Sequence, residues 1–320
     1  MAPIIEANNL RKSFGDVEAV ADISFRIEKG ELFGFLGPNG AGKTTTIKML
    51  TGLARPDGGT LYLGGIDCTD DPKAAQHLIG VVPDESNLYP ELTGLENLCF
   101  CAALYGMDKS RRQARARELL DSFGLAQAAD RKFGSYSKGM KRKLAIAAGI
   151  IHRPAILFLD EPTTGIDVLS ARQIRQLIAE LHRLGTTIFL TTHYIEEAER
   201  LCERIAFIVS GRIVRIDSIE HLLQPVQGKH MMEISWANPL AHGENLAQAF
   251  PELTVETLLP GTIRIESDEP IHVGVLVRFL EEQGGHVLEA RRIQPSLEDV
   301  FINITGIKGE SMRNEGGRGA

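Results

Sequence analysis

The pattern of apolar and polar positions divides the chain into alternating short strands and helices. Apolar residues gather at 4–7 and alternate with polar ones at 23–27, and the apolar run ELFGFL follows closely. A second apolar run, PAILFLDEP at 154–162, is typical of a strand buried on both faces. Helical spacing of apolar residues continues at 174–181. Strands that alternate with helices predict an α/β fold with a mainly parallel sheet.

The segment between these two buried strands has a different character. From about 93 to 151 the pattern is helical in three successive stretches, which predicts an inserted helical subdomain. Beyond the second buried strand, TTIFLTTH is again strand-like. RIAFIVSGRIVRI then predicts a hairpin that turns at Ser210–Gly211 and closes one edge of the sheet. The N-terminal strands add an antiparallel portion, so that residues 1–223 form one domain.

The remaining third of the chain predicts a smaller α+β domain. Residues 224–306 follow the order strand, helix, strand, strand, helix, strand, which is compatible with a split βαβ sandwich. A final apolar helical stripe is typical of packing rather than of a cofactor site. It consists of Leu297, Val300, Phe301 and Ile304. Residues 307–320 are polar and glycine-rich and predict a flexible tail.

Composition excludes several classes of protein. The 320 residues contain no apolar run near the roughly 20 residues that a membrane-spanning helix needs, and the N-terminus lacks a secretory signal. The four cysteines match no metal spacing and indicate reduced thiols. A formal net charge of −7 gives no global argument for nucleic-acid binding, although local basic patches exist. One such patch is the helix with Arg111, Arg112, Arg115 and Arg117, for which a solvated surface is the default and a contact with anionic lipid or a partner loop the alternative.

The segment GPNGAGKT matches the P-loop pattern in the required context, between an apolar strand and a helix. Its glycines allow backbone N–H groups and a helix N-terminus to face a phosphate. Lys43 adds a positive charge near the β- and γ-phosphates, and the Thr44 hydroxyl is suited to Mg²⁺. The alternative is a glycine-rich turn without a ligand. The candidate nucleotide-binding residues of this loop are Gly37, Pro38, Asn39, Gly40, Ala41, Gly42, Lys43, Thr44 and Thr45.

Two carboxylates and one histidine follow the ends of later strands. Asp160 closes the second buried strand, where a carboxylate can hold a metal ion. Glu161 points to the other side and is the candidate general base for an attacking water. His193 is the candidate contact to a γ-phosphate. The alternatives are a solvent-facing carboxylate pair and a structural histidine.

The stretch GSYSKGMKRKLAIAAG at 134–149 places a serine, a glycine and several bases at the start of a helix. The plain interpretation is that Ser137 caps the helix and that the bases form its solvated side. These bases are Lys138, Lys141, Arg142 and Lys143.

Together these motifs resemble the ATP-binding subunit of ABC transporters over residues 4–217. GPNGAGKT is similar to the family's Walker A, ILFLDE to Walker B, TGID with Asp167 to the D-loop, and His193 to the switch histidine. YSKGM stands where the family has its LSGGQ signature. The resemblance implies a P-loop NTPase core, bound ATP with Mg²⁺, and a dimer in which the signature of one subunit closes over the ATP of the other.

The resemblance assigns roles to four further residues. Ser137 and Gly139 would contact the partner's ATP, and Phe14 would stack on adenine, although a core aromatic is the competing interpretation. Lys138 and Met140 depart from the signature's usual Gly and Gln. Asp84 replaces the usual Gln of the Q-loop. Two unit charges about 5 Å apart repel by about 3 kcal/mol at an effective dielectric near 20, so Asp84 needs the metal or a water between it and the γ-phosphate.

The function that the resemblance implies is ATP hydrolysis that powers a separate integral membrane permease. Asp84 and the C-terminal SLEDVFINITG resemble the exporter branch for drugs and antibiotics. Expected partners are a second ATP-binding subunit, in a homodimer, and the permease, at the cytoplasmic face of the membrane; no nucleic acid is expected. The alternative is a soluble ABC ATPase without a transport role. The absence of an Asn-Lys-x-Asp motif disfavours a GTPase, and substrate identity is not encoded here.

Overall fold

The structure is a computed structural model, and it describes residues 2–224, 230–237, 244–293 and 296–307. Two compact units are present. Of the described residues, one unit comprises those up to Ile219 together with Phe301 to Ile307, and the other comprises those from Glu220 to Val300. The predicted domain boundaries were 223/224 and 306, so the structure returns to the first unit before the predicted end of the small domain. The predicted tail from residue 308 on lies outside the described residues.

The first unit contains a six-stranded sheet with the strand order β10-β9-β3-β8-β7-β6. Its members are β3 (Leu32–Leu36), β6 (Ile79–Val82), β7 (Ile156–Asp160), β8 (Thr187–Thr192), β9 (Arg204–Val209) and β10 (Arg212–Ser218). All neighbours are parallel except β10, which pairs antiparallel with β9 at the edge. Every residue of β3, β7 and β8 is buried, which explains why their sequences are continuously apolar. The predicted mainly parallel sheet and its closing hairpin are confirmed.

A second sheet in this unit is antiparallel, with the order β2-β1-β4-β5. Its members are β1 (Ile5–Phe14), β2 (Val17–Ile27), β4 (Gly58–Leu63) and β5 (Ile66–Asp67). β1 and β2 are longer than the apolar segments 4–7 and 23–27 that predicted them. The pairing register shifts between Ala7 and Leu10, and both Asn9 and Asp22 have positive φ. Such bulges interrupt the alternation of apolar and polar residues, so the pattern ends while the strand continues.

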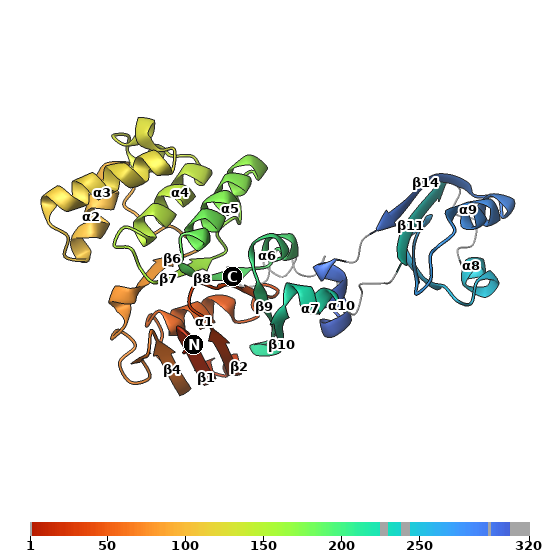
Figure 1. Cartoon of the computed structure of the whole chain (residues 1–320), viewed down its shortest axis with the longest axis horizontal. Coiled ribbons are helices and arrows are strands. Elements are labelled where there is room, and N and C mark those ends of the chain that lie inside the picture. The colour runs from red at the N-terminus through yellow and green to blue at the C-terminus, as the bar shows by residue number, and fades with distance from the viewer. Residues whose placement is uncertain (1, 225–229, 238–243, 294–295, 308–320) are drawn as a thin grey trace. The chain divides into compact units, whose positions relative to one another are not determined.

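Helices cover the six-stranded sheet (Figure 1). Helices α2 to α5 lie on one side of strands β6, β7 and β8, and the antiparallel strands β1, β2 and β4 lie on the other side. The helices are α1 (Lys43–Leu50), α2 (Gly94–Leu104), α3 (Lys109–Ser122), α4 (Lys138–Gly149), α5 (Val168–Arg183), α6 (Ile195–Leu201) and α7 (Ile219–Leu223), with the 3₁₀ turns η1 (Gln76–Leu78), η2 (Ala126–Ala128) and η3 (Phe133–Ser135).

The helical subdomain begins with a capping box at the start of α2: Glu96 N donates to Thr93 Oγ1 and Thr93 N donates to Glu96 Oε2. Thr93, at the start of the predicted helical stretch, is therefore the N-cap of α2.

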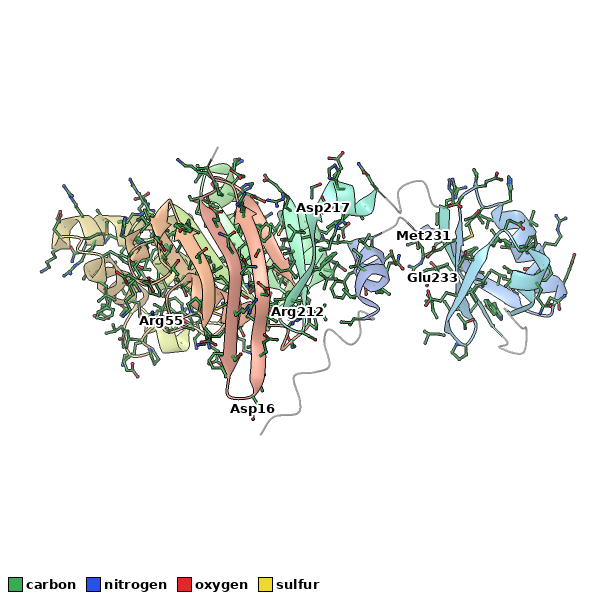
Figure 2. All side chains as sticks on the ribbon, turned by 90° about the horizontal axis from the view of Figure 1, so that it is seen from below. Asp16, Arg55, Arg212, Asp217, Met231 and Glu233 are labelled. Carbon is green, nitrogen blue, oxygen red and sulfur yellow. The ribbon has the colours of Figure 1, made fainter. Side chains whose placement is uncertain are left out.

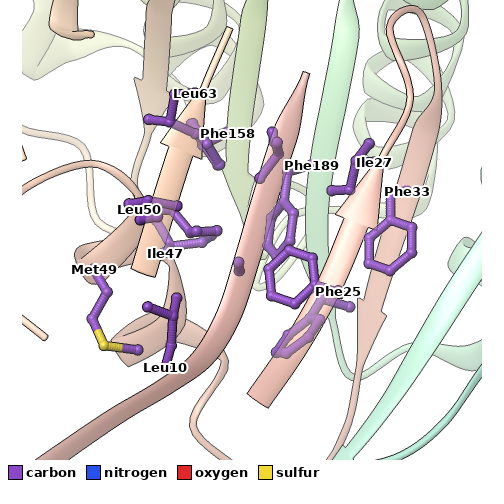
Figure 3. Close-up of a cluster of buried hydrophobic side chains, with 14 of the residues drawn as sticks. Leu10, Phe25, Ile27, Phe33, Ile47, Met49, Leu50, Leu63, Phe158 and Phe189 are labelled. Atoms are coloured by element: carbon purple, nitrogen blue, oxygen red, sulfur yellow. The ribbon is translucent and has the colours of Figure 1, made fainter. Parts of the chain in front are cut away.

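The main core lies between the antiparallel sheet, α1 and the six-stranded sheet, as Figure 3 shows. Phenylalanine rings from several strands meet there with centroids 5.4–6.0 Å apart. They are Phe25, Phe33, Phe35, Phe158 and Phe189. Ile47 and Leu50 of α1 enter the same core, so the helix that follows the P-loop is fixed against the sheet.

The second unit has a four-stranded antiparallel sheet with the order β12-β13-β11-β14. Its elements are β11 (His230–Ala237), α8 (Glu244–Ala249), β12 (Thr254–Leu259), β13 (Thr262–Ser267), α9 (Val273–Glu282) and β14 (His286–Ile293), followed by α10 (Leu297–Thr305). The predicted βαββαβ order is present. α10 carries the apolar stripe into the first unit, where the rings of Phe301 and Phe207 lie 5.2 Å apart. Leu297, Val300 and Phe301 of the stripe are buried, as predicted, whereas Ile304 is 37% exposed.

Candidate active site

The P-loop connects buried strand β3 to helix α1 and surrounds the Lys43 ammonium. Lys43 is 5% exposed, and its Nζ donates to Gly37 O at 2.8 Å and to Pro38 O at 3.1 Å. A third oxygen, Glu161 Oε1, lies 3.1 Å away. An ammonium has three hydrogens, so these three acceptors account for all of them. A phosphate oxygen that binds Lys43 must therefore compete with Glu161.

Gly42 is the residue whose backbone allows the loop to enter the helix. Its φ is 103°, a left-handed conformation that favours glycine. A Cβ at this position would lie 2.5 Å from Ala19 O. The close approach of β2 to the loop and the left-handed turn therefore both require the glycine at this point of the motif.

Glu161 is held by groups from three other segments. His193 Nδ1 lies 2.7 Å from Glu161 Oε2, and the Thr164 hydroxyl donates to the same oxygen at 2.9 Å. Because an ionised carboxylate only accepts hydrogen bonds, Nδ1 of His193 carries the hydrogen. The backbone of Glu161 is left-handed, with φ 49°, and its N–H donates to Thr191. Non-glycine residues in this region are rare and cluster at functional sites.

The surroundings of Glu161 keep its carboxyl ionised. Burial by itself raises the pKa of Glu161, but the hydrogen bond from His193 and the charge of Lys43 act in the opposite direction. The result is a pKa below the ordinary value of 4.5. A carboxylate that is ionised at neutral pH and held in one orientation can accept a proton from water, as a general base must.

Asp160 lies directly before Glu161 but faces a different environment. It is 3% exposed, and the Thr191 hydroxyl of neighbouring strand β8 donates to its Oδ1. Glu161 follows the last residue of β7 and has a left-handed backbone, and its carboxylate contacts Lys43, Thr164 and His193 rather than the Thr191 hydroxyl that binds the Asp160 carboxylate. The two acids are therefore separated into distinct positions, as the sequence predicted.

A pocket of about 340 Å³ collects most of the predicted site residues. Its lining is Ala19, Asn39, Gly40, Gly42, Lys43, Thr44, Thr45, Asp84, Glu161, Thr164 and His193. Gly37 and Pro38 face Lys43 through their carbonyls. Asp160, Ala41 and four other predicted residues do not line this pocket. Those four are Phe14, Ser137, Gly139 and Asp167.

Phe14 and Asp167 lie on other elements. Phe14 is the last residue of β1, is 53% exposed, and has Lys12 Nζ 5.4 Å from its ring centroid. Figure 2 shows Asp16 at the tip of the same β1–β2 hairpin. The core interpretation of Phe14 is therefore wrong, and an exposed face remains for stacking. Asp167 caps α5, and its Oδ1 accepts from Ser170 N at 2.9 Å.

The signature-like segment begins helix α4 as predicted. Ser137 is the N-cap, and its Oγ accepts from Met140 N at 3.2 Å. Gly139 is buried against α5: a Cβ there would lie 2.3 Å from Ser170 Oγ and 2.6 Å from Ser170 Cβ. The glycine is thus required by helix packing, whatever it contacts outside this chain.

One of the bases after the signature was assigned wrongly. The plain interpretation placed Arg142 on the solvated side of the helix, but its residue is 8% exposed. Its guanidinium donates to Pro83 O at 2.7 Å, to Asp84 O at 2.6 Å and to Asp84 Oδ1 at 3.2 Å. Lys141 and Lys143 on either side are half-buried. A helix period of 3.6 residues explains this, since neighbours in sequence face different directions.

Asp84 lies on the pocket wall, in the loop after β6. Burial raises the pKa of Asp84, and the negative charge of Glu161 adds to this effect, while Arg142 opposes it. The net direction is upward. Asp84 is therefore a carboxylate near a second carboxylate, with a guanidinium as its counter-charge.

Comparisons with known proteins agree with this geometry. A family model described as ABC transporter matches residues 20–164. Over 310 residues the chain is 37% identical to the linearmycin resistance ATP-binding protein LnrL of Bacillus subtilis (strain 168), and the match covers 95% of this chain and 98% of that protein. This chain belongs to the ABC transporter family. The daunorubicin/doxorubicin resistance ATP-binding protein DrrA of Streptomyces peucetius is 38% identical over 308 residues, which is 94% of this chain and 92% of DrrA.

Solved ABC cassettes share the fold. The dimeric post-hydrolysis state of the ATP-binding cassette MJ0796 with ADP and Pi matches with a TM-score of 0.62 and 28% identity, over 67% of this chain and 98% of that one. A structure of an ATP-binding subunit of an ABC transporter matches with a TM-score of 0.63 and 29% identity, over 70% and 93% of the two chains. The P-loop NTPase fold and the ATPase activity predicted from the sequence are confirmed. The chain is an ATP-binding, ATP-hydrolysing subunit of this family.

Three threonines support the ABC site without having been predicted. Thr191 binds Asp160, Thr164 binds Glu161, and the Thr163 hydroxyl donates to Glu197 Oε1 at 2.7 Å. Glu197 on α6 is 3% exposed, and burial raises the pKa of its carboxyl. Thr163 and Thr164 lie two and three residues after Glu161, so their nearness in sequence to the Walker B acids is an available signal. Thr191 could be found only through the pairing of β7 with β8.

No helix among the described residues is long and apolar enough to cross a membrane. The longest helix, α5, has charged residues on its exposed side.

Proposed function

We propose that this chain powers the export of a drug or antibiotic through a separate integral membrane permease, at the cytoplasmic face of the membrane. The site supplies the ATPase machinery: Lys43, Glu161 and His193 meet in one pocket of about 340 Å³. The relatives supply the direction of transport, since LnrL and DrrA are named resistance ATP-binding proteins and match over nearly their whole length. The transported compound is not specified by either.

The residues of the pocket divide the chemistry among themselves. P-loop N–H groups and Lys43 bind phosphate oxygens, and this leaves Glu161 with one partner fewer. Glu161 then accepts a proton from the attacking water, while His193 and Thr164 keep its carboxylate in place. The base is held by contacts within one chain. ATP that removes Lys43 from Glu161 therefore also frees Glu161 Oε1 to accept a hydrogen bond from the attacking water.

Mg²⁺ fits the oxygen donors of the site. The Thr44 hydroxyl lines the pocket and the buried Asp160 carboxylate closes β7, and both are hard ligands of the kind that Mg²⁺ prefers. Asp84, which also lines the pocket, is a third candidate. No group of three or more His, Cys, Asp or Glu side chains in the described ranges could hold a metal alone. We propose that Thr44 and Asp160 hold Mg²⁺ together with ATP oxygens, where the ion would neutralise phosphate charge.

Two copies of the chain would complete each site. Ser137 accepts a hydrogen bond as the cap of α4 and keeps its own hydroxyl hydrogen for donation. Together with the N–H groups at the start of α4, it forms a donor cluster suited to a phosphate. Ser137 and Gly139 do not line the P-loop pocket of their own chain. We therefore infer a homodimer in which these donors face the partner's ATP.

The decisive variant is Glu161→Gln in the purified chain. We expect ATP binding to persist, turnover to fall by about 10²–10⁴, and a dimer to accumulate with ATP in size-exclusion chromatography. Glu196→Gln is the matched control, because Glu196 is exposed on α6 and pairs with Arg200. Unchanged hydrolysis would remove Glu161 from the role of base, and a monomer with ATP would contradict the shared site.

A second experiment separates transport from other tasks. The tagged chain is expressed at its native level, membranes are solubilised in detergent, and the proteins recovered with it are identified. An exporter subunit should recover an integral membrane protein with several spans, and that recovery should survive nuclease treatment. Recovery of ribosomes or nucleic acid in its place would favour a soluble ABC ATPase without a transport role.

A further inference from the structure

Arg142 connects two parts of the site that are far apart in the sequence. It lies in the second turn of α4, the helix capped by Ser137, and it contacts the loop after β6. Nη1 donates to Pro83 O at 2.7 Å, and Nη2 donates to Asp84 O at 2.6 Å and Asp84 Oδ1 at 3.2 Å. One guanidinium therefore holds both the backbone and the side chain of this loop.

The geometry of these contacts suits arginine in particular. A guanidinium is planar and always charged, and its donors are fixed relative to one another, so two carbonyls and a carboxylate oxygen are held in one arrangement. Burial of a charge is costly unless it is paired and hydrogen-bonded. The contacts to Pro83 and Asp84 meet both conditions. Arg142 and the loop are therefore expected to move together.

Asp84 occupies a position where such support matters. Its side chain is 49% exposed and lines the same pocket as Lys43 and Glu161. Two carboxylates on one wall repel each other and would also repel a phosphate. The positive charge of Arg142 reduces this repulsion, and its bond to Oδ1 limits the orientations of the Asp84 carboxylate.

We propose that Arg142 is a positioning residue for ATP hydrolysis, which braces Asp84 at the pocket wall and joins this wall to the signature helix α4. The role in hydrolysis rests on the proposed function of the pocket, but the brace itself does not. Because Ser137 caps the same helix, a displacement at Ser137 is transmitted to Asp84 through Arg142. The loop would thus respond to what binds at the start of α4.

The brace is tested first in the ligand-free protein by hydrogen–deuterium exchange. In Arg142→Gln the amides of residues 84–88 should exchange faster by about tenfold, since the loop loses two carbonyl anchors. Lys143→Gln is the matched control, with the same loss of charge one residue along the helix, and should leave exchange unchanged. Equal exchange in Arg142→Gln and wild type would overturn the proposal without reference to ATP.

The second readout separates positioning from binding. With Arg142→Gln we expect kcat to fall by about tenfold or more, because a small misplacement at the reacting centre is costly, while ATP affinity without Mg²⁺ changes less than about threefold. Arg142→Lys should recover part of the loss, since it keeps the charge but not the planar fork. Faster exchange with an unchanged kcat would overturn the role in hydrolysis. Failure of wild type itself to bind ATP would refute the proposed function and leave the exchange result standing.

A double-mutant cycle shows whether Arg142 acts through Asp84. Asp84→Asn removes the carboxylate, and Asp84→Asn with Arg142→Gln should lose no more activity than the worse single variant. A loss equal to the product of the two single losses would overturn the coupling. If Arg142→Gln melts below the assay temperature, Arg142→Lys replaces it in the same cycle.

Discussion

Replacement of Gly139 by alanine tests the packing of the signature helix. An added Cβ would lie 2.6 Å from Ser170 Cβ, roughly 1 Å closer than the distance of about 3.5–4.0 Å at which two carbon atoms attract. It would also lie 2.3 Å from Ser170 Oγ, but that hydroxyl can rotate away. Ser170 Cβ is fixed to the backbone of α5, so α4 and α5 must separate.

The expected loss of stability follows from this clash. Overpacking of a close contact costs about 1–3 kcal/mol, and the change from glycine to alanine inside a helix returns roughly 0.5–1 kcal/mol. We expect Gly139→Ala to lower the free energy of unfolding by about 1–2 kcal/mol in urea titrations followed by circular dichroism. The slope of the transition should not change, because the folded state stays compact.

A compensating variant makes the argument refutable. Ser170→Gly removes both atoms that clash. Gly139→Ala should therefore cost much less free energy of unfolding in the Ser170→Gly background than in wild type. Ser170→Ala keeps the Cβ and should recover much less. A Gly139→Ala variant as stable as wild type, or a double variant with no recovery, would refute the packing argument.

Two further predictions concern the P-loop pocket. Gly42→Ala should abolish detectable ATP binding in a fluorescent-nucleotide titration and destabilise the chain by about 2 kcal/mol or more. The reason is that a φ of 103° is strained for alanine and that its Cβ would lie 2.5 Å from Ala19 O. Full ATP binding by this variant would contradict the prediction. The pKa of Glu161 is lower in the folded chain than its ordinary value of 4.5, so its contribution to stability is full above that pH and is lost as the pH falls through the folded value. Glu161→Gln should flatten the loss of stability below about pH 4.5 in acid titrations, and an identical acid profile would refute the assignment.

The sequence predicted those features that depend on neighbours along the chain. The P-loop, the Walker B acids and the cap of α4 are each coded within a few residues, because a turn, a strand end or a helix start is a local event. The motifs accordingly predict Lys43, Glu161 and His193 as site residues, and the structure brings all three into one pocket. The buried strands were equally clear, since burial on both faces leaves a continuous apolar run.

Contacts between distant segments were not predictable in the same way. Arg142 was read as part of a basic surface because the side on which a helix is buried depends on what packs against it, and Pro83 and Asp84 are far away in the sequence. β1 was predicted too short for a related reason. Its polar residues are paired on both sides, with β2 and β4, and register shifts break the alternation that marks a strand.

Helices α4 and α5 join two motifs that the sequence presents separately. Gly139, within the signature-like segment, lies against Ser170, and the N–H of Ser170 is the group that Asp167 accepts to cap α5. The start of α4 and the start of α5 are thus linked through one residue. Ser137 and Asp167 are both exposed and neither lines the P-loop pocket of its own chain, so both helix starts can be reached by a second copy. A partner that binds at one is then expected to be sensed at the other, and a change at Ser170 should disturb dimer-dependent hydrolysis while ATP binding by the monomer persists.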